Sequence, residues 1–375
     1  MTVRVSKPEF NLREKLSELD KPTGVKGLDL MGSDTTQDAR SFISAGRKNY
    51  IINGDFQVSQ RGDYTSATTV SNQAYYLDRW TVDVSGVGAT IQHKTNQLVG
   101  NSSGDYYKNT VTMAATSSAT GYLQLRQKME LHKSLFGKTV TVSAWVKSNH
   151  PNIRLRTEGG WYASGNNWDS LQSHNGDGRW QKLSMTVRLK SSPSSLIFGI
   201  ILWGSTGGPS VNHAQGPITN GDYYEFTDFQ LELGENATDF EHRTFAEELL
   251  LCQRYLYRLG GLSKQYQVVG NGFIGQNGST ICCKIVVDLP TTMRTNPSVS
   301  VIGTDAFWGH TGGAATDMTV TLTANQGGTW TNASSGNHVW LDFGRSSGGS
   351  PSNGTACVVY TKSNNQGEVL FNAEM

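Results

Sequence analysis

The loop from Glu158 to Trp168 carries the side chains best suited to bind a sugar. Trp161, Tyr162 and Trp168 lie there among glycine, serine and asparagine residues. Indole and phenol rings stack on the apolar faces of sugars, while amides and hydroxyls bond to sugar hydroxyl groups. The composition predicts a glycan-binding loop. The alternative is that the three rings are buried at the end of the fold or between subunits.

A second set of candidate ligand-binding residues lies nearer the C-terminus. Trp308 and His310, and then Trp330, fall in glycine-rich stretches that we expect to be loops. Loops at a free tip would meet a cell surface first. The same alternative, burial in protein contacts, applies to them.

The sequence offers two weak catalytic arrangements. Asp239 and His242 have the Asp-x-x-His spacing of sites in which a carboxylate orients an imidazole, but Gly-x-Ser-x-Gly is absent. Glu158 and Asp169 could form a glycosidase pair, which is defined by separation in space and not by sequence spacing. We therefore expect no catalytic residues and no enzymatic activity.

Charge and hydropathy exclude two classes of partner. The chain has 32 basic and 31 acidic residues, a net charge of +1, which gives no field to attract nucleic acid or an anionic membrane. Neither a signal-peptide core nor an apolar run of membrane-spanning length is present. We expect a protein made in a cytoplasm that binds no nucleic acid and does not insert into membranes.

The four cysteines show no metal-binding spacing. Cys252, Cys282, Cys283 and Cys357 form no Cys-x-x-Cys pair, and no histidine follows at zinc-finger spacing. Burial as small hydrophobic side chains is the expected role.

The elements that must position these residues are mainly strands, because 42 glycines and only 17% charged residues indicate many turns. Apolar residues alternate with polar ones around Val140 to Val146 and Leu183 to Leu189, and Leu196 to Trp203 is almost continuously apolar. An apolar pair before Asn53 and Gly54 predicts a first strand, bent at a glycine where a side chain would clash. Residues 49–243 are predicted to form a β-sandwich.

Residues 262–375 are predicted to form a second, small distal β-sandwich. Short strand patterns separated by Gly/Ser/Asn-rich loops support this, namely Ile281–Leu289, Met318–Ala324, His338–Phe343, Thr355–Thr361 and Glu368–Ala373.

Residues 1–48 hold most of the sequence patterns that predict helices. Leu12, Leu16 and Leu19 recur at helical spacing until Pro22 and Gly24. Such short helices cannot form a core alone, so we expect this segment to attach to a partner surface.

Residues 244–261 are predicted to form a helix with a coiled-coil stripe. Thr244 and Glu247 have capping-box spacing, and apolar residues then step by 4, 3, 4 and 3 positions, namely Phe245, Leu249, Cys252, Leu256 and Leu259. The stripe predicts a seam between chains. The alternative is that this face packs on a neighbouring domain of the same chain.

Several sequence segments resemble those of bacteriophage tail-fibre and related virion appendage proteins, whose body is a jelly roll like a carbohydrate-binding module. These are Arg47–Gly62, Tyr76–Trp80, Phe226–Gly234 and Thr238–Tyr255, with a weaker match at Asp288–Pro297. The resemblance implies a homotrimer that attaches to other virion proteins through residues 1–48. It also implies multivalent adhesion to a host surface glycan by a virion protein assembled in a bacterial cytoplasm.

Two other functions stay open alongside this resemblance. One is a structural or decorating protein that stabilises the particle without binding a receptor. The other is a polysaccharide depolymerase, which needs a cleft with paired carboxylates.

The resemblance also bears on metal binding. Jelly rolls of this kind often hold a structural calcium ion between the first and last strands, and Asp55 and Asp228 fall in the corresponding segments. The alternative is that no metal binds and Asp228 bonds to a turn, so we expect no cofactor and leave calcium open.

Overall fold

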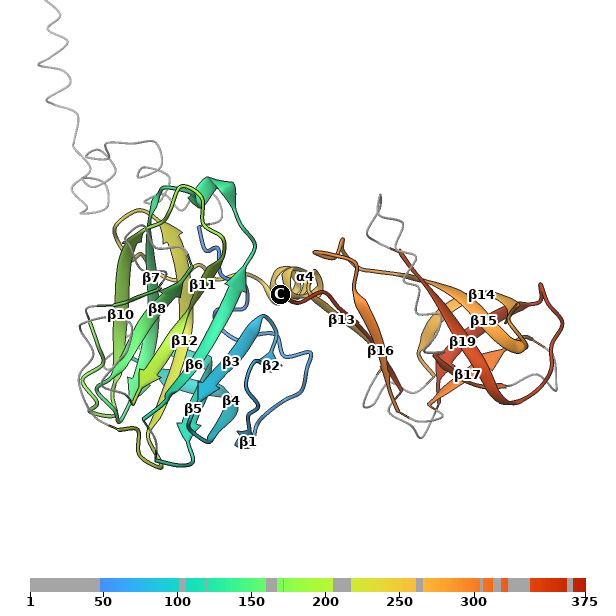
Figure 1. Ribbon diagram of the computed structural model, residues 1–375, viewed down its shortest axis with the longest axis horizontal. Helices are drawn as coiled ribbons and strands as arrows, with labels where there is room; N and C mark the ends of the chain where they lie inside the picture. The colour runs from blue at the N-terminus through green and yellow to red at the C-terminus, as the bar shows by residue number, and fades with distance from the viewer. Residues whose placement is uncertain are drawn as a thin grey trace, which may run out of the picture. The chain divides into compact units, whose positions relative to one another are not determined.

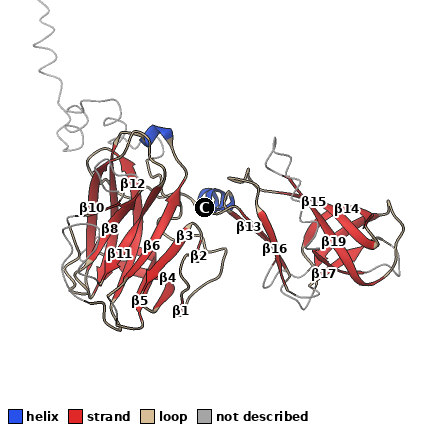
Figure 2. Ribbon diagram, viewed as in Figure 1, coloured by secondary structure: helices blue, strands red, loops and turns tan. Residues whose placement is uncertain are grey.

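The structure is a computed structural model and describes residues 48–100, 106–118, 120–159, 167–170, 172–204, 217–260, 266–303, 306–312, 318–322, 338–362 and 367–375. Ile51–Met375 forms one compact unit. The predicted helix with Leu12, Leu16 and Leu19 lies outside the described residues. Within them the fold is mainly β, as predicted (Figure 2). None of the helices described there is long and apolar enough to cross a membrane.

Two antiparallel six-stranded sheets face each other in the jelly roll (Figure 1). Sheet A has the order β1 (Thr68–Thr69), β4 (Ala89–Val99), β5 (Tyr106–Ala115), β12 (Tyr223–Leu233), β7 (Thr139–Ser148) and β10 (Trp180–Arg188). Sheet B has the order β2 (Tyr75–Leu77), β3 (Trp80–Ser85), β6 (Tyr122–Met129), β11 (Leu196–Trp203), β8 (Ile153–Glu158) and β9 (Asn167–Asp169). A short 3₁₀ helix, η1 (Lys133–Leu135), lies between β6 and β7.

Alternating apolar residues of both sheets fill the space between them, as the sequence pattern predicts. Val140 and Val142 of β7 and Ile200 of β11 are fully buried. Four aromatic rings pack together at one part of this core, with Trp80 between Phe56, Phe226 and Phe229 at centroid distances of 5.3–5.5 Å. Burial of such rings is the main stabilising contribution to a sandwich of this kind.

The predicted first strand is wrong. Residues Ile51–Val58 form an irregular buried segment, because Asn53 and Phe56 have positive φ values of 57° and 56°. The expected clash at Gly54 is present: an added Cβ would lie 2.2 Å from the carbonyl oxygen of Phe229. The segment lies against β12 without pairing as a strand, apart from a bond of 2.9 Å from the Phe229 amide to the Gly54 carbonyl.

Buried side chains from distant elements satisfy the backbone of this segment. The Gln127 amide bonds to both the N–H and the C=O of Ile52, at 3.0 and 2.7 Å. Glu248 accepts from the Asn53 amide at 2.5 Å. The Asn53 side chain bonds to both backbone groups of Val58. An unpaired buried amide costs about 1–3 kcal/mol, so these side chains are required for the segment to be buried.

The predicted long helix ends early. Helix α4 (Phe245–Gln253) begins with the predicted capping box between Thr244 and Glu247. Leu256 and Leu259 instead lie in strand β13 (Leu256–Gly260), so the predicted continuous helical seam is wrong beyond Gln253. A helix there would leave one edge of the strand that pairs with β13 without backbone hydrogen bonds.

The five seam residues differ in exposure. Cys252, Leu256 and Leu259 are buried within the chain, Leu249 is half-buried and Phe245 is exposed.

The distal domain contains the predicted strands in a different arrangement from two facing sheets. A closed barrel has the order β14 (Val268–Asn277), β15 (Thr280–Asp288), β19 (His338–Gly348), β18 (Met318–Leu322), β17 (Phe307–His310) and β20 (Ala356–Thr361). Beside it, β13, β21 (Glu368–Asn372) and β16 (Ser298–Ile302) form a three-stranded sheet in that order. Closure leaves no sheet edge exposed in the barrel.

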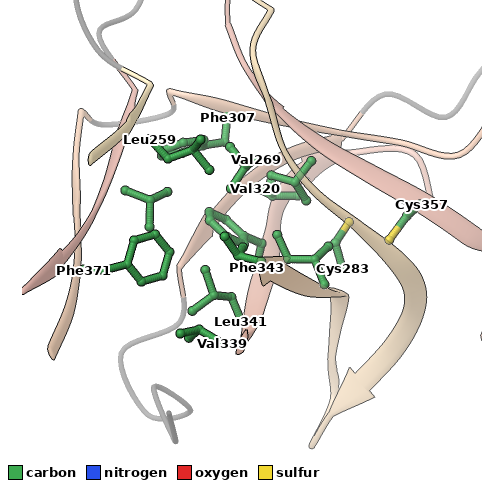
Figure 3. Close-up of a cluster of buried hydrophobic side chains, with 14 of the residues drawn as sticks. Leu259, Val269, Cys283, Phe307, Val320, Val339, Leu341, Phe343, Cys357 and Phe371 are labelled. Carbon is green, nitrogen blue, oxygen red and sulfur yellow. The ribbon is translucent and has the colours of Figure 1, made fainter. Parts of the chain in front are cut away.

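One core joins the barrel and the small sheet. Leu259 and Phe371 of the small sheet pack with Phe307 and Phe343 of the barrel (Figure 3). The four cysteines are buried and free, as the sequence predicts.

The segment after β21 contacts the jelly roll through buried charges. Glu374 accepts hydrogen bonds from Arg79 and, at 3.2 Å, from Arg61. The Arg79 guanidinium also lies 3.4 Å from the centroid of the Tyr255 ring, next to the end of α4. Arg79 is almost fully buried, so these partners compensate the loss of its hydration.

We predict that Gly54→Ala destabilises the protein by about 3 kcal/mol, because the new methyl group would collide with backbone that cannot move without disturbing β12. The matched control is Gly221→Ala. Gly221 has φ +93° and open space around an added Cβ, so only backbone strain of about 1–2 kcal/mol is expected. Equal losses in urea unfolding would show that crowding at Gly54 is unimportant.

We predict that Asp78 makes stability fall as pH rises through the window from about 4 to about 6. Burial raises the pKa of Asp78 to about 6, although Gln60 donates two hydrogen bonds to its carboxylate. The folded state therefore binds the proton more tightly than the unfolded state.

The test of this prediction is the pH dependence of Asp78→Asn. Its stability relative to the parent protein should increase by up to about 3 kcal/mol between pH 4 and pH 7, at about 1.4 kcal/mol for each unit of pKa shift. Urea unfolding at several pH values measures this difference. A constant difference would contradict it.

Candidate functional site

The outward side of sheet B carries an unusual set of charged and amide side chains. Strand pairing places Asp83 of β3 opposite Gln124 of β6. Arg126 of β6 and Arg156 of β8 lie on either side of Gly199 in β11. Since Gly199 has no side chain, the two arginines flank the middle of this surface. We call the set Asp83, Gln124, Arg126, Arg156 and Glu158, with Tyr122 and Trp203, the sheet B face.

The charged groups of the sheet B face are linked to one another. Glu158 accepts from Arg126 at 2.6 Å, from Gln124 at 2.8 Å and from Arg156 at 3.0 Å. Arg126 also pairs with Asp83 at 2.7 Å. Such a network fixes each side chain in one orientation, which is the condition for selective hydrogen bonding to a ligand.

Two aromatic rings lie at one end of the sheet B face. Tyr122 and Trp203 pack at a centroid distance of 5.1 Å, and the Arg156 guanidinium lies 5.1 Å from the Trp203 ring. Partial burial, with the nearby Asp83 carboxylate, raises the pKa of Tyr122, and its hydroxyl donates to Asp83 at 3.3 Å. The face thus combines an aromatic end with fixed donors and acceptors.

The outward side of sheet A is partly covered by the chain itself. The segment after β12 folds back over it, with the Thr238 amide donating to Glu232 at 2.9 Å and the Glu241 amide donating to Gln230 at 2.8 Å. The Asp239–His242 motif lies in this covering segment. Its position matches a structural role.

Asp55 and Asp228, the two residues considered for calcium, are buried near each other. Burial raises the pKa of Asp55, and the Asp228 carboxylate adds to the increase. One oxygen of each residue, Oδ1, has no hydrogen-bond partner among the described residues. Their other oxygens accept from Gln57, at 2.5 Å, and from the Lys108 ammonium.

Asp55 and Asp228 do not complete a calcium site by themselves. Calcium takes six to eight oxygen ligands, and the described residues include no cluster of three or more His, Cys, Asp or Glu side chains that could hold a metal, so backbone carbonyls would have to supply most of the ligands. The Lys108 ammonium already forms an ion pair with the Asp228 carboxylate. A lysine therefore supplies the charge that a cation would bring.

The structure describes only some of the predicted ligand residues. Trp161, Tyr162 and Trp330 lie outside the described residues. The backbone of Trp168 lies in β9, opposite Thr157, so the predicted loop connects two strands of sheet B. The same pairing places Asp169 opposite Arg156.

Trp308 and His310 lie on strand β17 and not in a loop, so that expectation is wrong. The glycines around them fit a strand because Gly309 lies close to the core: an added Cβ would lie 2.7 Å from the Cys283 sulfur. The Lys362 ammonium lies 5.0 Å from the Trp308 ring centroid and donates to Thr319 at 2.9 Å. One face of the Trp308 ring is thus occupied.

Sequence reasoning missed most of the sheet B face. Gln124, Arg126 and Arg156 occupy alternate positions of strands, where polar residues normally face solvent. Several polar residues at such positions in successive strands could have indicated this face. Their alignment across the sheet, however, follows only from the strand order. Trp203 ends the apolar run that predicts β11, and such a run predicts burial for each of its side chains.

Comparisons with known proteins show partial likeness in fold. No protein-family model matches the sequence, and a comparison with curated proteins finds no significant match. Among solved structures, the enzymatically active domain of tailspike protein 4 of bacteriophage CBA120 matches with a TM-score of 0.32 and 9% identity, over 50% of this chain and 21% of that chain.

Two carbohydrate-binding structures match over about the same share of this chain. TmCBM61, in complex with β-1,4-galactotriose, has a TM-score of 0.30 and 14% identity, over 50% of this chain and 100% of its own. The CBM22-1–GH10 modules of Clostridium thermocellum xylanase 10B have a TM-score of 0.29 and 10% identity, over 52% of this chain and 30% of theirs. At these TM-scores, function does not follow from the likeness.

We predict that Lys108→Met lowers the free energy of unfolding by about 3 kcal/mol, because it leaves the buried Asp228 carboxylate without its ammonium partner. Lys94→Met is the control, since Lys94 pairs with Glu225 at 3.1 Å but is more exposed, and about 1 kcal/mol is expected. EDTA should leave the thermal midpoint of the parent protein unchanged. A midpoint lowered by EDTA and restored by CaCl₂ would establish a calcium site instead.

Proposed function

We propose that this protein is a non-enzymatic glycan-binding protein and that the sheet B face is its binding site. The observation that carries the proposal is the pairing of Tyr122 and Trp203 beside the fixed network around Glu158. Sugars need both an apolar surface for a ring face and directed polar groups for hydroxyls. The sheet B face offers both on neighbouring strands.

The polar groups of this face suit binding more than catalysis. Glu158 already accepts hydrogen bonds from Gln124, Arg126 and Arg156. A general acid in glycoside hydrolysis must instead direct its own O–H at the leaving-group oxygen. The lone pairs of Glu158 that these bonds leave unused can accept hydrogen bonds from sugar hydroxyls.

The test is binding of the full-length protein to an array of galactose, glucose, xylose and N-acetylhexosamine oligosaccharides. We predict that the protein binds at least one of them and that Gln124→Ala weakens this binding about tenfold or more, because the 1% exposed Gln124 no longer holds the Glu158 carboxylate in place through its 2.8 Å hydrogen bond. Trp203→Ala should have a similar effect through the aromatic end.

Two controls distinguish a loss of ligand contacts from a loss of the fold in these variants. Tyr107→Ala removes a 75% exposed ring on sheet A and should leave binding unchanged. Circular dichroism should show that Gln124→Ala keeps the parent fold. Wild-type affinity in both Gln124→Ala and Trp203→Ala, or no binding by the parent protein to any member of the array, would contradict the proposal.

We further propose that the protein acts as a phage tail-fibre or appendage subunit that adheres to host glycans in several copies. The support is the sequence resemblance, together with a binding face whose single contacts would be weak and would gain from multivalency. Residues 1–48 are the proposed attachment segment for virion proteins. Light scattering tests the proposed homotrimer, and a monomer at every concentration would contradict it.

A second function is favoured by one observation, the low exposure of the sheet B face. Arg126 is 9% exposed and Trp203 is 8% exposed. A face of such low exposure also suits a structural protein of a virion that binds no receptor. The array distinguishes the two functions, since a structural protein binds none of the oligosaccharides.

A further inference from the structure

The outer wall of the distal barrel exposes large apolar side chains on three neighbouring strands. Phe273 of β14, Val286 of β15 and Trp340 of β19 are 41%, 39% and 37% exposed. Strand pairing places Trp340 opposite Val286, and Val286 opposite Asn271. In the next row, Phe273 lies opposite Lys284, and Lys284 opposite Asp342. These six residues therefore share one side of the barrel wall, which we call the distal platform.

The two rings of the distal platform are held at a fixed angle. Phe273 and Trp340 pack edge to face at a centroid distance of 5.9 Å. The indole N–H of Trp340 donates to the Asp342 carboxylate at 3.3 Å, which restrains the ring although it is exposed. A restrained aromatic ring loses little conformational entropy when a ligand stacks on it.

Polar groups are also fixed beside these rings. Lys284 donates to Asp342 at 2.8 Å. Its aliphatic stem crosses the neighbouring strand, where the Lys284 Cε would lie 2.6 Å from a Cβ added to Gly275. Glycine at that position leaves room for the stem and thereby places the ammonium next to the carboxylate. The pair carries no net charge but offers both donors and an acceptor.

We propose that the distal platform is a second sugar-binding site, which takes a single neutral pyranose ring on Trp340 beside Phe273. The ring face of the sugar stacks on the indole, and its hydroxyls bond to Lys284, Asp342 and Asn271. Because Lys284 and Asp342 neutralise each other, a charged sugar gains no net attraction here. The choice of sugar as ligand rests on the proposed function, whereas the location does not.

Trp308 on the same barrel differs from Trp340 in what contacts its ring. Lys362 lies over the Trp308 ring, so a cation already occupies the face on which a sugar would stack. Trp340 instead interacts with its ion pair through the edge of the ring, at the indole N–H. Trp308 is therefore a matched control residue.

The test uses full-length protein labelled with 5-fluorotryptophan and observed by ¹⁹F NMR. The chain has 9 tryptophans, and the resonances of Trp203, Trp308 and Trp340 are assigned by single Trp→Phe variants. The probes are methyl β-galactopyranoside, methyl β-glucopyranoside and N-acetylglucosamine, each titrated to about 100 mM, since a single ring contact gives millimolar affinity. We expect the Trp340 resonance to shift saturably with at least one probe and the Trp308 resonance to stay in place.

Variants then test the neighbours of Trp340. Phe273→Ala and Lys284→Met, both at the barrel surface, should each weaken the Trp340 response about fivefold or more. Gln276→Ala, at an exposed position of β14 outside the distal platform, should not change it. The Trp203 resonance reports on the sheet B face separately, so sugar binding at the two sites is tested independently.

Two results would overturn the second site. One is a Trp340 resonance that no probe moves, whether or not Trp203 responds. The other is a Trp340 shift that follows protein concentration without sugar, which would make the platform a contact between copies of this chain.

Discussion

The jelly roll depends on burying an irregular stretch of backbone, Ile51–Val58, beside its aromatic core. A strand would have satisfied its own amides through a neighbour, but positive φ values at Asn53 and Phe56 prevent regular pairing. Side chains from β6 and α4, Gln127 and Glu248, must reach in to bond to it. Helix α4, which follows the last strand of the sandwich, is thus required to bury a segment that precedes the first strand.

Glu248 shows how tightly this arrangement is coupled. Burial raises the pKa of Glu248, while Arg243 opposes the increase by pairing with it at 3.3 Å. Arg243 in turn donates to the carbonyl of Ile51 at 3.0 Å. One ion pair therefore supplies both a donor and an acceptor to the buried backbone. Loss of either partner would leave an uncompensated charge as well as an unpaired peptide group.

Sequence patterns predicted the features that depend on local chemistry. Alternation of apolar residues defined β7 and β10, and the spacing of Thr244 and Glu247 defined the start of α4, because pleat and capping geometry involve near neighbours. The end of α4 could not be predicted this way. Leu256 and Leu259 fit a helical stripe equally well, and what makes them a strand is β21, more than 100 residues further along the chain.

The candidate sites show the same division between local and distant information. The aromatic residues chosen from sequence stood out because they were clustered along the chain. The residues of the sheet B face and the distal platform are scattered in sequence, and only strand order brings Arg126 next to Arg156, or Phe273 next to Trp340. Periodicity identified the strands but could not identify their neighbours.

The pairing of β13 with β21 has a consequence for how this chain could change by recombination. Leu256 and Asn372 are directly opposite each other, so the distal domain begins and ends at the same place. A block of sequence with both ends together can be exchanged for another without threading the chain through the sandwich. Compatible blocks would keep Tyr255 and Glu374, whose contacts with Arg79 fasten both ends of the exchangeable cassette.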